Sequence, residues 1–334
     1  MSELAPSYRA PAWLPGGHLQ TIYPRLLALP QVRYRRERWE TPDGDFIDLD
    51  WTDLDGRART AGWTASESAP LVVLFHGLEG GSNSHYAAVL MAALREPGWK
   101  GVVVHFRGCS GELNRLRRAY HSGDSAEIDW ILRRLRQSHP CGLYAVGVSL
   151  GGNALLKWLG EQRSAASAVI DAAVAVSAPV DLQAAGNTLD AGFNLVYTRN
   201  FLLTMKRKTL AKLERFPDLC DRRLVVRSRT LREFDDLVTA PLHGFRDTDD
   251  YWSQASSKPW LRHICAPTLL INARNDPFLP ADSLPAASEV SALVTLDFPQ
   301  EGGHVGFVSG AFPGHCGWLP SRILGFVRER ERAR

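Results

Sequence analysis

The chain has 334 residues, of which 45% are hydrophobic, and a formal net charge of +3 from 39 basic and 36 acidic side chains. This length and apolar content suffice for one large packed domain, or for one domain that carries an insertion. So small a charge excess, from scattered basic residues, argues against a nucleic-acid-binding protein. The five cysteines lie far apart and include no CxxC pair, which argues against a disulfide framework or a zinc site and favours the cytoplasm.

Nothing in the sequence predicts a membrane or export segment. Residues 1–6 do not combine a basic start with an apolar run, so we expect no signal peptide. The longest purely apolar runs, such as Leu71–Phe75, are far shorter than the roughly 20 residues that span a bilayer. We therefore expect a cytoplasmic protein without an integral membrane segment.

The N-terminal part of the chain predicts a surface segment followed by a hairpin. Residues 1–30 are rich in proline and aromatic side chains, and we expect them to wrap over the body of the protein. Segments 32–40 and 45–52 alternate apolar and polar residues on either side of a Pro-Asp-Gly turn. This pattern is typical of two antiparallel strands.

From residue 71 onward, continuous apolar runs alternate with amphipathic helical patterns. The predicted strands are 71–75, 101–106, 143–148, 172–177, 268–272 and 293–298. The predicted helices are 84–95, 123–137, 150–161 and 319–331. Such alternation is typical of a parallel sheet with helices on both faces. The predicted fold class is therefore α/β, with a mostly parallel central sheet flanked by helices.

A long segment between the fourth and fifth of these strands interrupts the alternation. Residues 181–263 show helical patterns but no convincing strand. Because connections in α/β proteins are usually short, we interpret this segment as a helical cap insertion; ordinary crossover helices are the alternative. The predicted domain plan is a core from 1–180, the cap from 181–263 and the rest of the core from 264–334.

The chemistry-bearing motif follows the predicted strand 143–148. Gly147-Val148-Ser149-Leu150-Gly151 reads G-x-S-x-G and opens a predicted helix, which is the pattern of the nucleophile elbow in α/β-hydrolases. The sharp turn would raise the serine above the sheet, and small residues at 147, 151 and 152 would avoid collisions. The helix N-terminus beside the serine favours negative charge.

Two other interpretations use the same residues. Gly147-x-Ser149-x-x-Gly152 is a degenerate G-x-G-x-x-G, which could bind a dinucleotide phosphate. No acidic residue ends a strand about 20 residues later, as that site requires. A serine at a strand–helix turn can also be a simple N-cap. The partners of Ser149 therefore decide between these interpretations.

A serine nucleophile needs a base, and the base needs an orienting group. In this fold the order along the chain is serine, acid, histidine. Asp276 and His304 each follow a predicted strand, so both lie at the edge where α/β sheets place their sites. We therefore predict Ser149, Asp276 and His304 as a catalytic triad. Asp181 fits a helix cap equally well, and His315 does not follow a strand.

The oxyanion of an acyl-transfer reaction needs two N–H donors. The backbone of Leu150, directly after the nucleophile, is the first predicted donor. The second is the backbone of Leu78, in the glycine-rich loop that follows strand 71–75 and contains Gly77. His76 in the same loop resembles a catalytic base, but we interpret it as a side chain that stabilises the loop.

Nine longer stretches form a more specific pattern than G-x-S-x-G alone. They are GGHLQTIYPRL (16–26), HGLEGGS (76–82), HFRGCSGELNR (105–115), YHSGD (120–124), GVSLGGNALLKWLGE (147–161), FDDLVTAPLHGF (234–245), DDYWSQASS (249–257), NDPFLP (275–280) and EGGHVGF (301–307). Together they extend over nearly the full chain. In these stretches the chain resembles the YheT-like branch of the α/β-hydrolases, a family of abhydrolase-domain carboxylesterases and lipases.

The resemblance implies carboxylic-ester hydrolysis with Ser149, Asp276 and His304 as the triad. Members often carry a second aspartate just before the acid, where this chain has Asn275; Asp276 keeps the position before proline. Animal members carry an N-terminal membrane anchor, which this sequence does not show. We therefore do not expect their membrane location here.

The expected function is that of a serine hydrolase acting on short- to medium-chain acyl esters or acylglycerol-like lipids through an acyl-enzyme. No HExxH, Walker A or clustered Cys/His motif occurs, so we expect no cofactor and no metal. A thioesterase, amidase or acyltransferase with the same triad is an alternative, as is a non-catalytic binding protein of this fold. Segment 194–216 mixes apolar and basic residues; we favour an inward-packed cap helix over one that senses lipid surfaces.

Overall fold

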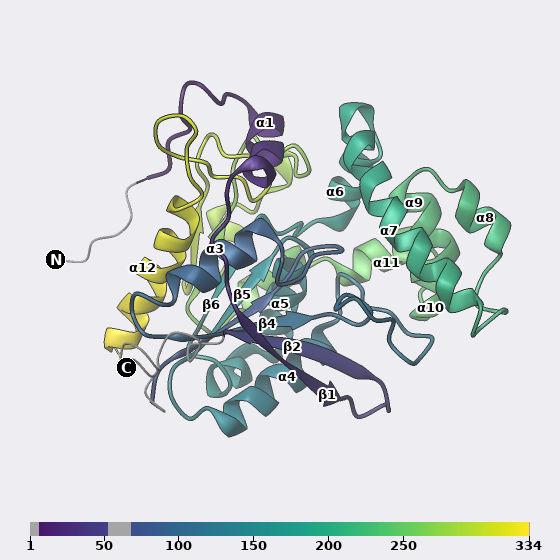
Figure 1. Ribbon diagram of the computed structural model, residues 1–334, viewed down its shortest axis with the longest axis horizontal. Coiled ribbons are helices and arrows are strands. Elements are labelled where there is room, and N and C mark those ends of the chain that lie inside the picture. The colour runs from purple at the N-terminus through teal and green to yellow at the C-terminus, as the bar shows by residue number, and fades with distance from the viewer. Residues whose placement is uncertain (1–6, 53–67, 334) are drawn as a thin grey trace.

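The computed structural model describes residues 7–52 and 68–333, and its centre is one eight-stranded sheet (Figure 1). The strand order is β1-β2-β4-β3-β5-β6-β7-β8. The hairpin strands β1 and β2 are antiparallel to each other, and β2 is antiparallel to β4, whereas all other neighbours are parallel. The strands are β1 Tyr34–Glu40, β2 Phe46–Thr52, β3 Leu71–Phe75, β4 Lys100–His105, β5 Leu143–Val148, β6 Ala172–Val176, β7 Thr268–Ile271 and β8 Val294–Asp297.

Four helices cover the two faces of this sheet. They are α3 His85–Ala93, α4 Ser125–Ser138, α5 Leu150–Gln162 and α12 Trp318–Ala333. Strand β3 is buried along its whole length because its side chains alternate between two cores. Leu71, Val73 and Phe75 belong to the core that includes residues of α4 and α5. Val72 and Leu74 belong to the core that includes residues of α3 and α12. No helix in the described ranges has the length and apolar character needed to cross a bilayer.

This architecture confirms the predicted α/β class with a mostly parallel sheet and flanking helices. The runs predicted at 71–75 and 143–148 have the same limits as β3 and β5. Other limits are shifted by one or two residues: the helix predicted at 84–95 ends at Ala93. Pro97 follows closely, and the residue before a proline disfavours the helical conformation.

The segment between β6 and β7 forms a group of helices at one end of the molecule (Figure 1). They are α6 Leu182–Leu189, α7 Leu195–Leu213, α8 Arg222–Arg227, α9 Leu231–Phe234, α10 Ala240–Leu242 and α11 Thr248–Ala255, with a π-helical turn at Asp235–Thr239. Short 3-10 turns at Gly192–Asn194 and Lys258–His263 complete it. The helices share a hydrophobic cluster of their own. Residues 177–267, all of them described, contain no strand.

The N-terminal segment packs against the loops that follow β7 and β8 (Figure 1). It forms α1 Gly17–Ile22 and a 3-10 turn at Tyr23–Leu26. A Cβ atom at Gly17 would lie 2.0 Å from the Asn275 carbonyl oxygen, so only glycine permits this approach. The fully buried Gln20 accepts a hydrogen bond from Val308 N at 3.0 Å. Residues 1–6 of the predicted wrap, and residue 334, lie outside the described residues.

Candidate active site

Ser149 stands at the turn between β5 and α5 with a backbone φ of 53°. A non-glycine residue in this left-handed region is strained, and surrounding structure must hold it there. A Cβ atom at Gly147 would lie 2.5 Å from the Gly151 carbonyl oxygen, and one at Gly151 would lie 2.4 Å from that of Phe75. The two glycines therefore allow the tight turn that places the Ser149 side chain above the end of the sheet.

Ser149, His304 and Asp276 form a chain of hydrogen bonds across three loops. His304 Nε2 lies 2.9 Å from Ser149 Oγ, and His304 Nδ1 lies 2.9 Å from Asp276 Oδ2. The other carboxylate oxygen of Asp276 accepts a hydrogen bond from Phe278 N at 2.9 Å. Because a carboxylate can only accept, Nδ1 carries the proton in this arrangement and Nε2 is free to accept the serine hydroxyl. The structure thus brings together the three residues that the sequence predicted as a triad.

The loop that carries His304 is held by residues from distant parts of the chain. His304 N donates to Thr21 Oγ1 at 2.8 Å, and Val305 N donates to Ser177 Oγ at 3.1 Å. The Phe278 ring stacks on the imidazole with 4.2 Å between ring centroids. Sequence reasoning did not identify Thr21 or Ser177 as supporting residues. The only sequence signal for Thr21 was its place in the stretch GGHLQTIYPRL.

The loop 76–81, which follows β3 and carries Leu78, lies beside Ser149. A Cβ atom at Gly77 would lie 3.1 Å from Ser149 Cβ, so the loop passes close to the nucleophile. A turn closed by Gly80 N and the Gly77 carbonyl oxygen at 2.9 Å shapes the loop. Among the described residues, no acceptor pairs with the Leu78 N–H. Leu150 is the first residue of α5, where helical N–H groups lack a partner within the helix.

The other residues considered from the sequence have structural surroundings. His76 is fully buried, and burial lowers its pKa to about 3. Its Nδ1 contacts the Gly77 carbonyl oxygen at 2.7 Å, and its Nε2 accepts from Phe106 N at 3.1 Å. Asp181 caps α6 with its side chain, and His315 lies in an isolated β-bridge. None of these three contacts Ser149 in the hydrogen bonds of the described residues.

Two hollows meet at Ser149. The first, here called the apolar cavity, has a volume of about 170 Å³ and lies between the sheet end and the helices of residues 182–255. Its walls include Leu78, Leu150, Leu182, Phe201, Met205 and Phe234. The second, here called the wide cleft, has a volume of about 860 Å³, and its walls include Thr21, Arg25, Gly77, Tyr197 and His304. Ser149, Leu78 and Phe278 line both.

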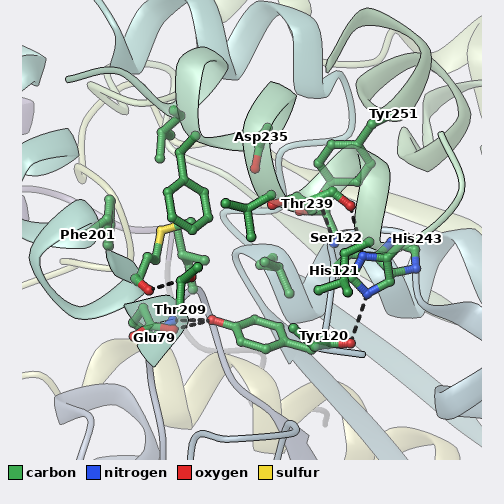
Figure 2. Close-up of a pocket in the computed structure, with 18 of the residues that line it drawn as sticks. Glu79, Tyr120, His121, Ser122, Phe201, Thr209, Asp235, Thr239, His243 and Tyr251 are labelled. Atoms are coloured by element: carbon green, nitrogen blue, oxygen red, sulfur yellow. Dashed lines mark hydrogen bonds between the residues drawn. The ribbon is translucent and has the colours of Figure 1, made fainter. Parts of the chain in front are cut away.

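The apolar cavity contains a few polar groups. Figure 2 shows the Tyr120 ring extending across it, with the hydroxyl directed toward Glu79. Asp235 lies near the opposite wall, where Trp252 Nε1 donates to its Oδ2 at 2.9 Å. Burial raises the pKa of Asp235 to about 7. In residues 7–52 and 68–333, no group of three or more His, Cys, Asp or Glu side chains is arranged to hold a metal ion.

Comparison with known proteins places this chain in a family. A sequence profile of the alpha/beta hydrolase fold matches residues 70–311. The chain is 42% identical to "Putative esterase YheT" of Escherichia coli over 92% of its length and 88% of that protein. It is 29% identical to "Phospholipase ABHD3" of Mus musculus, over 96% of this chain and 78% of that one. It is 30% identical to "Monoacylglycerol lipase" of Saccharomyces cerevisiae, over 73% and 56%.

Solved structures agree on the fold. An esterase of Pyrococcus furiosus, Pf2001, aligns over 89% of this chain and 91% of its own with a TM-score of 0.55 and 18% identity. Est1E of Butyrivibrio proteoclasticus aligns over 89% and 100% with a TM-score of 0.56 and 15% identity. From its sequence relatives and its fold together, the chain belongs to the α/β-hydrolase family, in its YheT-like branch, and is an esterase- or lipase-type carboxylic ester hydrolase.

Proposed function

We propose that the protein cleaves carboxylic esters through a covalent acyl-enzyme on Ser149, with His304 as base and Asp276 as the orienting acid. The observation that carries this proposal is the pair of 2.9 Å contacts from His304, one to Ser149 Oγ and one to Asp276 Oδ2. The strained backbone of Ser149 is a second support, because such strain is typical of a nucleophile elbow.

In the proposed reaction, His304 Nε2 takes the Ser149 proton as Oγ attacks the carbonyl carbon of the ester. The N–H groups of Leu78 and Leu150 stabilise the negative oxygen of the tetrahedral intermediate. His304 then gives the proton to the leaving alcohol as its C–O bond breaks. A water molecule then attacks the acyl carbon while His304 takes its proton, and His304 returns that proton to Ser149 Oγ as the bond to the acyl group breaks and the carboxylic acid leaves. General-base catalysis supplies about 10²–10⁴ in rate, and one oxyanion donor about 10²–10³.

The apolar cavity and the wide cleft offer separate binding places for the acyl part and the alcohol part of the substrate. The leaving oxygen must lie within hydrogen-bond reach of His304 Nε2 to receive its proton. His304 lines the wide cleft but is not part of the wall of the apolar cavity. We therefore place the alcohol in the wide cleft and the acyl chain in the apolar cavity.

The acyl part of the proposed substrate is a short- to medium-chain fatty acid, as an ester or in an acylglycerol-like lipid. The apolar walls of the cavity favour a hydrocarbon chain, and its limited volume favours a short one. The names of the phospholipase and lipase relatives are in keeping with a lipid ester. We also propose the division into a core of 1–180 and 264–334 and a cap of 181–263, because helices of that segment wall the cavity.

We further propose that the protein works in the cytoplasm. All five cysteines lie in the described ranges and are free thiols. Structural disulfides are common in oxidising compartments and rare where thiols are kept reduced. The free thiols therefore favour a reducing compartment.

The test of the catalytic proposal is labelling with a fluorophosphonate, followed by intact mass. We expect one adduct on the wild type, none on Ser149→Ala, and one on the control Ser138→Ala, which changes an exposed serine at the end of α4. Equal labelling of Ser149→Ala, or an unlabelled wild type, would refute the assignment. A panel of p-nitrophenyl esters, acyl-CoAs and amides would then define the bond that the active enzyme cleaves.

A further inference from the structure

Helix α7 reaches the catalytic core through two lysines that lie one turn apart. Lys212 Nζ donates to the carbonyl oxygens of residues 116, 117 and 118 at 3.0, 3.0 and 2.7 Å. Lys208 Nζ donates to Glu79 Oε1 at 2.9 Å and lies 3.3 Å from Cys109 Sγ. Glu79 belongs to the loop 76–81 and directly follows Leu78, the proposed oxyanion donor. Helix α7 is therefore joined to the loop that presents that donor.

Glu79 adopts a conformation that needs support from its neighbours. Its φ of 56° lies in the left-handed region, which costs a residue other than glycine about 1 kcal/mol or more. The Tyr120 hydroxyl supports it twice: it accepts from Glu79 N at 2.9 Å and donates to Glu79 Oε1 at 2.8 Å (Figure 2). The same carboxylate oxygen thus receives one hydrogen bond from Tyr120 and one from Lys208.

The protonation states of the surrounding groups bear on whether the contact between Lys208 and Glu79 is an ion pair. Burial raises the pKa of Tyr120 well above its ordinary value, so the hydroxyl keeps its proton and donates. Burial also raises the pKa of Cys109 to about 11, so this residue is a neutral thiol near pH 7. Burial alone would lower the pKa of Lys208, but the net shift of its pKa is upward, and Glu79 is the charged partner of Lys208 near neutral pH. The Glu79 side chain is 8% exposed and the Lys208 side chain 26%, which makes this a largely desolvated ion pair.

The same helix also walls the apolar cavity. Phe201 and Met205, which precede Lys208 on α7, line the cavity together with Lys208 itself. An acyl chain in that cavity would therefore contact the helix whose lysine holds Glu79. Contacts with remote parts of a substrate can stabilise a transition state when they fix the geometry of the reacting centre.

We propose that Lys208 is a positioning residue, which through Glu79 holds the Leu78 N–H in its oxyanion-binding direction. The helix that covers the acyl chain would thereby also control the catalytic rate. This inference rests on the proposed function, because it assigns a role to a residue that supports the oxyanion donor.

The test compares Lys208→Met, Glu79→Gln and the double variant with the control Arg207→Met, which changes an exposed residue of the same helix. Steady-state hydrolysis of p-nitrophenyl butyrate gives kcat and KM for each full-length variant. We expect Lys208→Met to lower kcat about 10- to 100-fold, less than the loss of about 10²–10³ for removing an oxyanion donor. KM should stay within about twofold of the wild type. The double variant should be no slower than Lys208→Met, because both changes break one contact.

Three kinetic results would overturn the inference: an unchanged kcat in Lys208→Met, a change confined to KM, or an equal loss of kcat in Arg207→Met. Hydrogen exchange of the peptide 76–84 provides a readout that does not depend on activity. We expect faster exchange in Lys208→Met than in the wild type and in Arg207→Met, and equal exchange would refute the contact's role. A wild type without hydrolysis or fluorophosphonate labelling would refute the proposed function, while hydrogen exchange would still decide whether Lys208 orders the loop.

Discussion

Replacing Thr21 by valine tests whether the N-terminal segment supports the catalytic histidine. Thr21 Oγ1 accepts the hydrogen bond from His304 N at 2.8 Å, and Thr21 is 9% exposed. Valine has nearly the same shape but no acceptor, so the buried N–H of His304 would lose its partner. An unsatisfied buried donor costs about 1–3 kcal/mol, and we expect the free energy of unfolding to fall by that amount. If about 1.4 kcal/mol of this loss adds to the activation free energy, kcat falls about tenfold.

Urea unfolding followed by tryptophan fluorescence measures the stability of this variant, and ester hydrolysis measures kcat. Thr21→Ser is the matched control, because it keeps the hydroxyl and removes only a methyl group, worth about 0.8 kcal/mol. We expect Thr21→Ser to keep a kcat close to that of the wild type. If Thr21→Val and Thr21→Ser were equal in both stability and kcat, the hydroxyl would have no role in holding His304.

Three further predictions concern the acid, the buried carboxyl of the cavity and the elbow. Asp276→Asn should fold normally and lower kcat about 10³- to 10⁴-fold; activity near that of the wild type, with an unchanged circular dichroism spectrum, would contradict the assignment. Burial raises the pKa of Asp235 from 3.8 to about 7, so the stability that the protonated carboxyl contributes is lost as the pH rises through this range. Urea titrations should therefore show that the free energy of unfolding of Asp235→Asn rises relative to that of the wild type between about pH 4 and pH 7. A difference in unfolding free energy that does not change with pH would contradict this. In Gly151→Ala the new Cβ would lie 2.4 Å from the Phe75 carbonyl oxygen, so we expect a loss of about 3 kcal/mol and a lower Tm; an unchanged Tm would contradict the steric argument.

The sequence predicted the parts of the fold that depend on local patterns. Strands β3 and β5 are buried on both faces and therefore read as continuous apolar runs with clear ends. The carboxyl ends of parallel strands meet at one edge of a sheet, so the loops with Asp276 and His304 could be placed near Ser149 before any geometry was known.

The contacts that hold the site in place could not be predicted in this way. Thr21 and His304 are separated by 283 positions, and Lys208 and Glu79 by 129. Periodicity shows that one face of a segment is buried but not which distant segment covers it. A lysine on an amphipathic helix is usually solvated, so Lys208 gave no signal that its ammonium group contacts the loop beside the nucleophile.

The main chain leaves the sheet for the helices of residues 182–255 and returns to it at almost the same point. Leu182 N donates to Ser256 Oγ at 2.9 Å, and Lys258 N donates to the Val180 carbonyl oxygen at 2.9 Å. When the two ends of an inserted segment lie close together, lengthening the segment adds little loop-closure entropy, about 0.6 kcal/mol for each doubling of its length. Evolution can therefore exchange these helices as one module, and substrate preference can diverge while the sheet stays constant. On the role proposed for Lys208, a replacement for these helices would also have to place a cation beside Glu79.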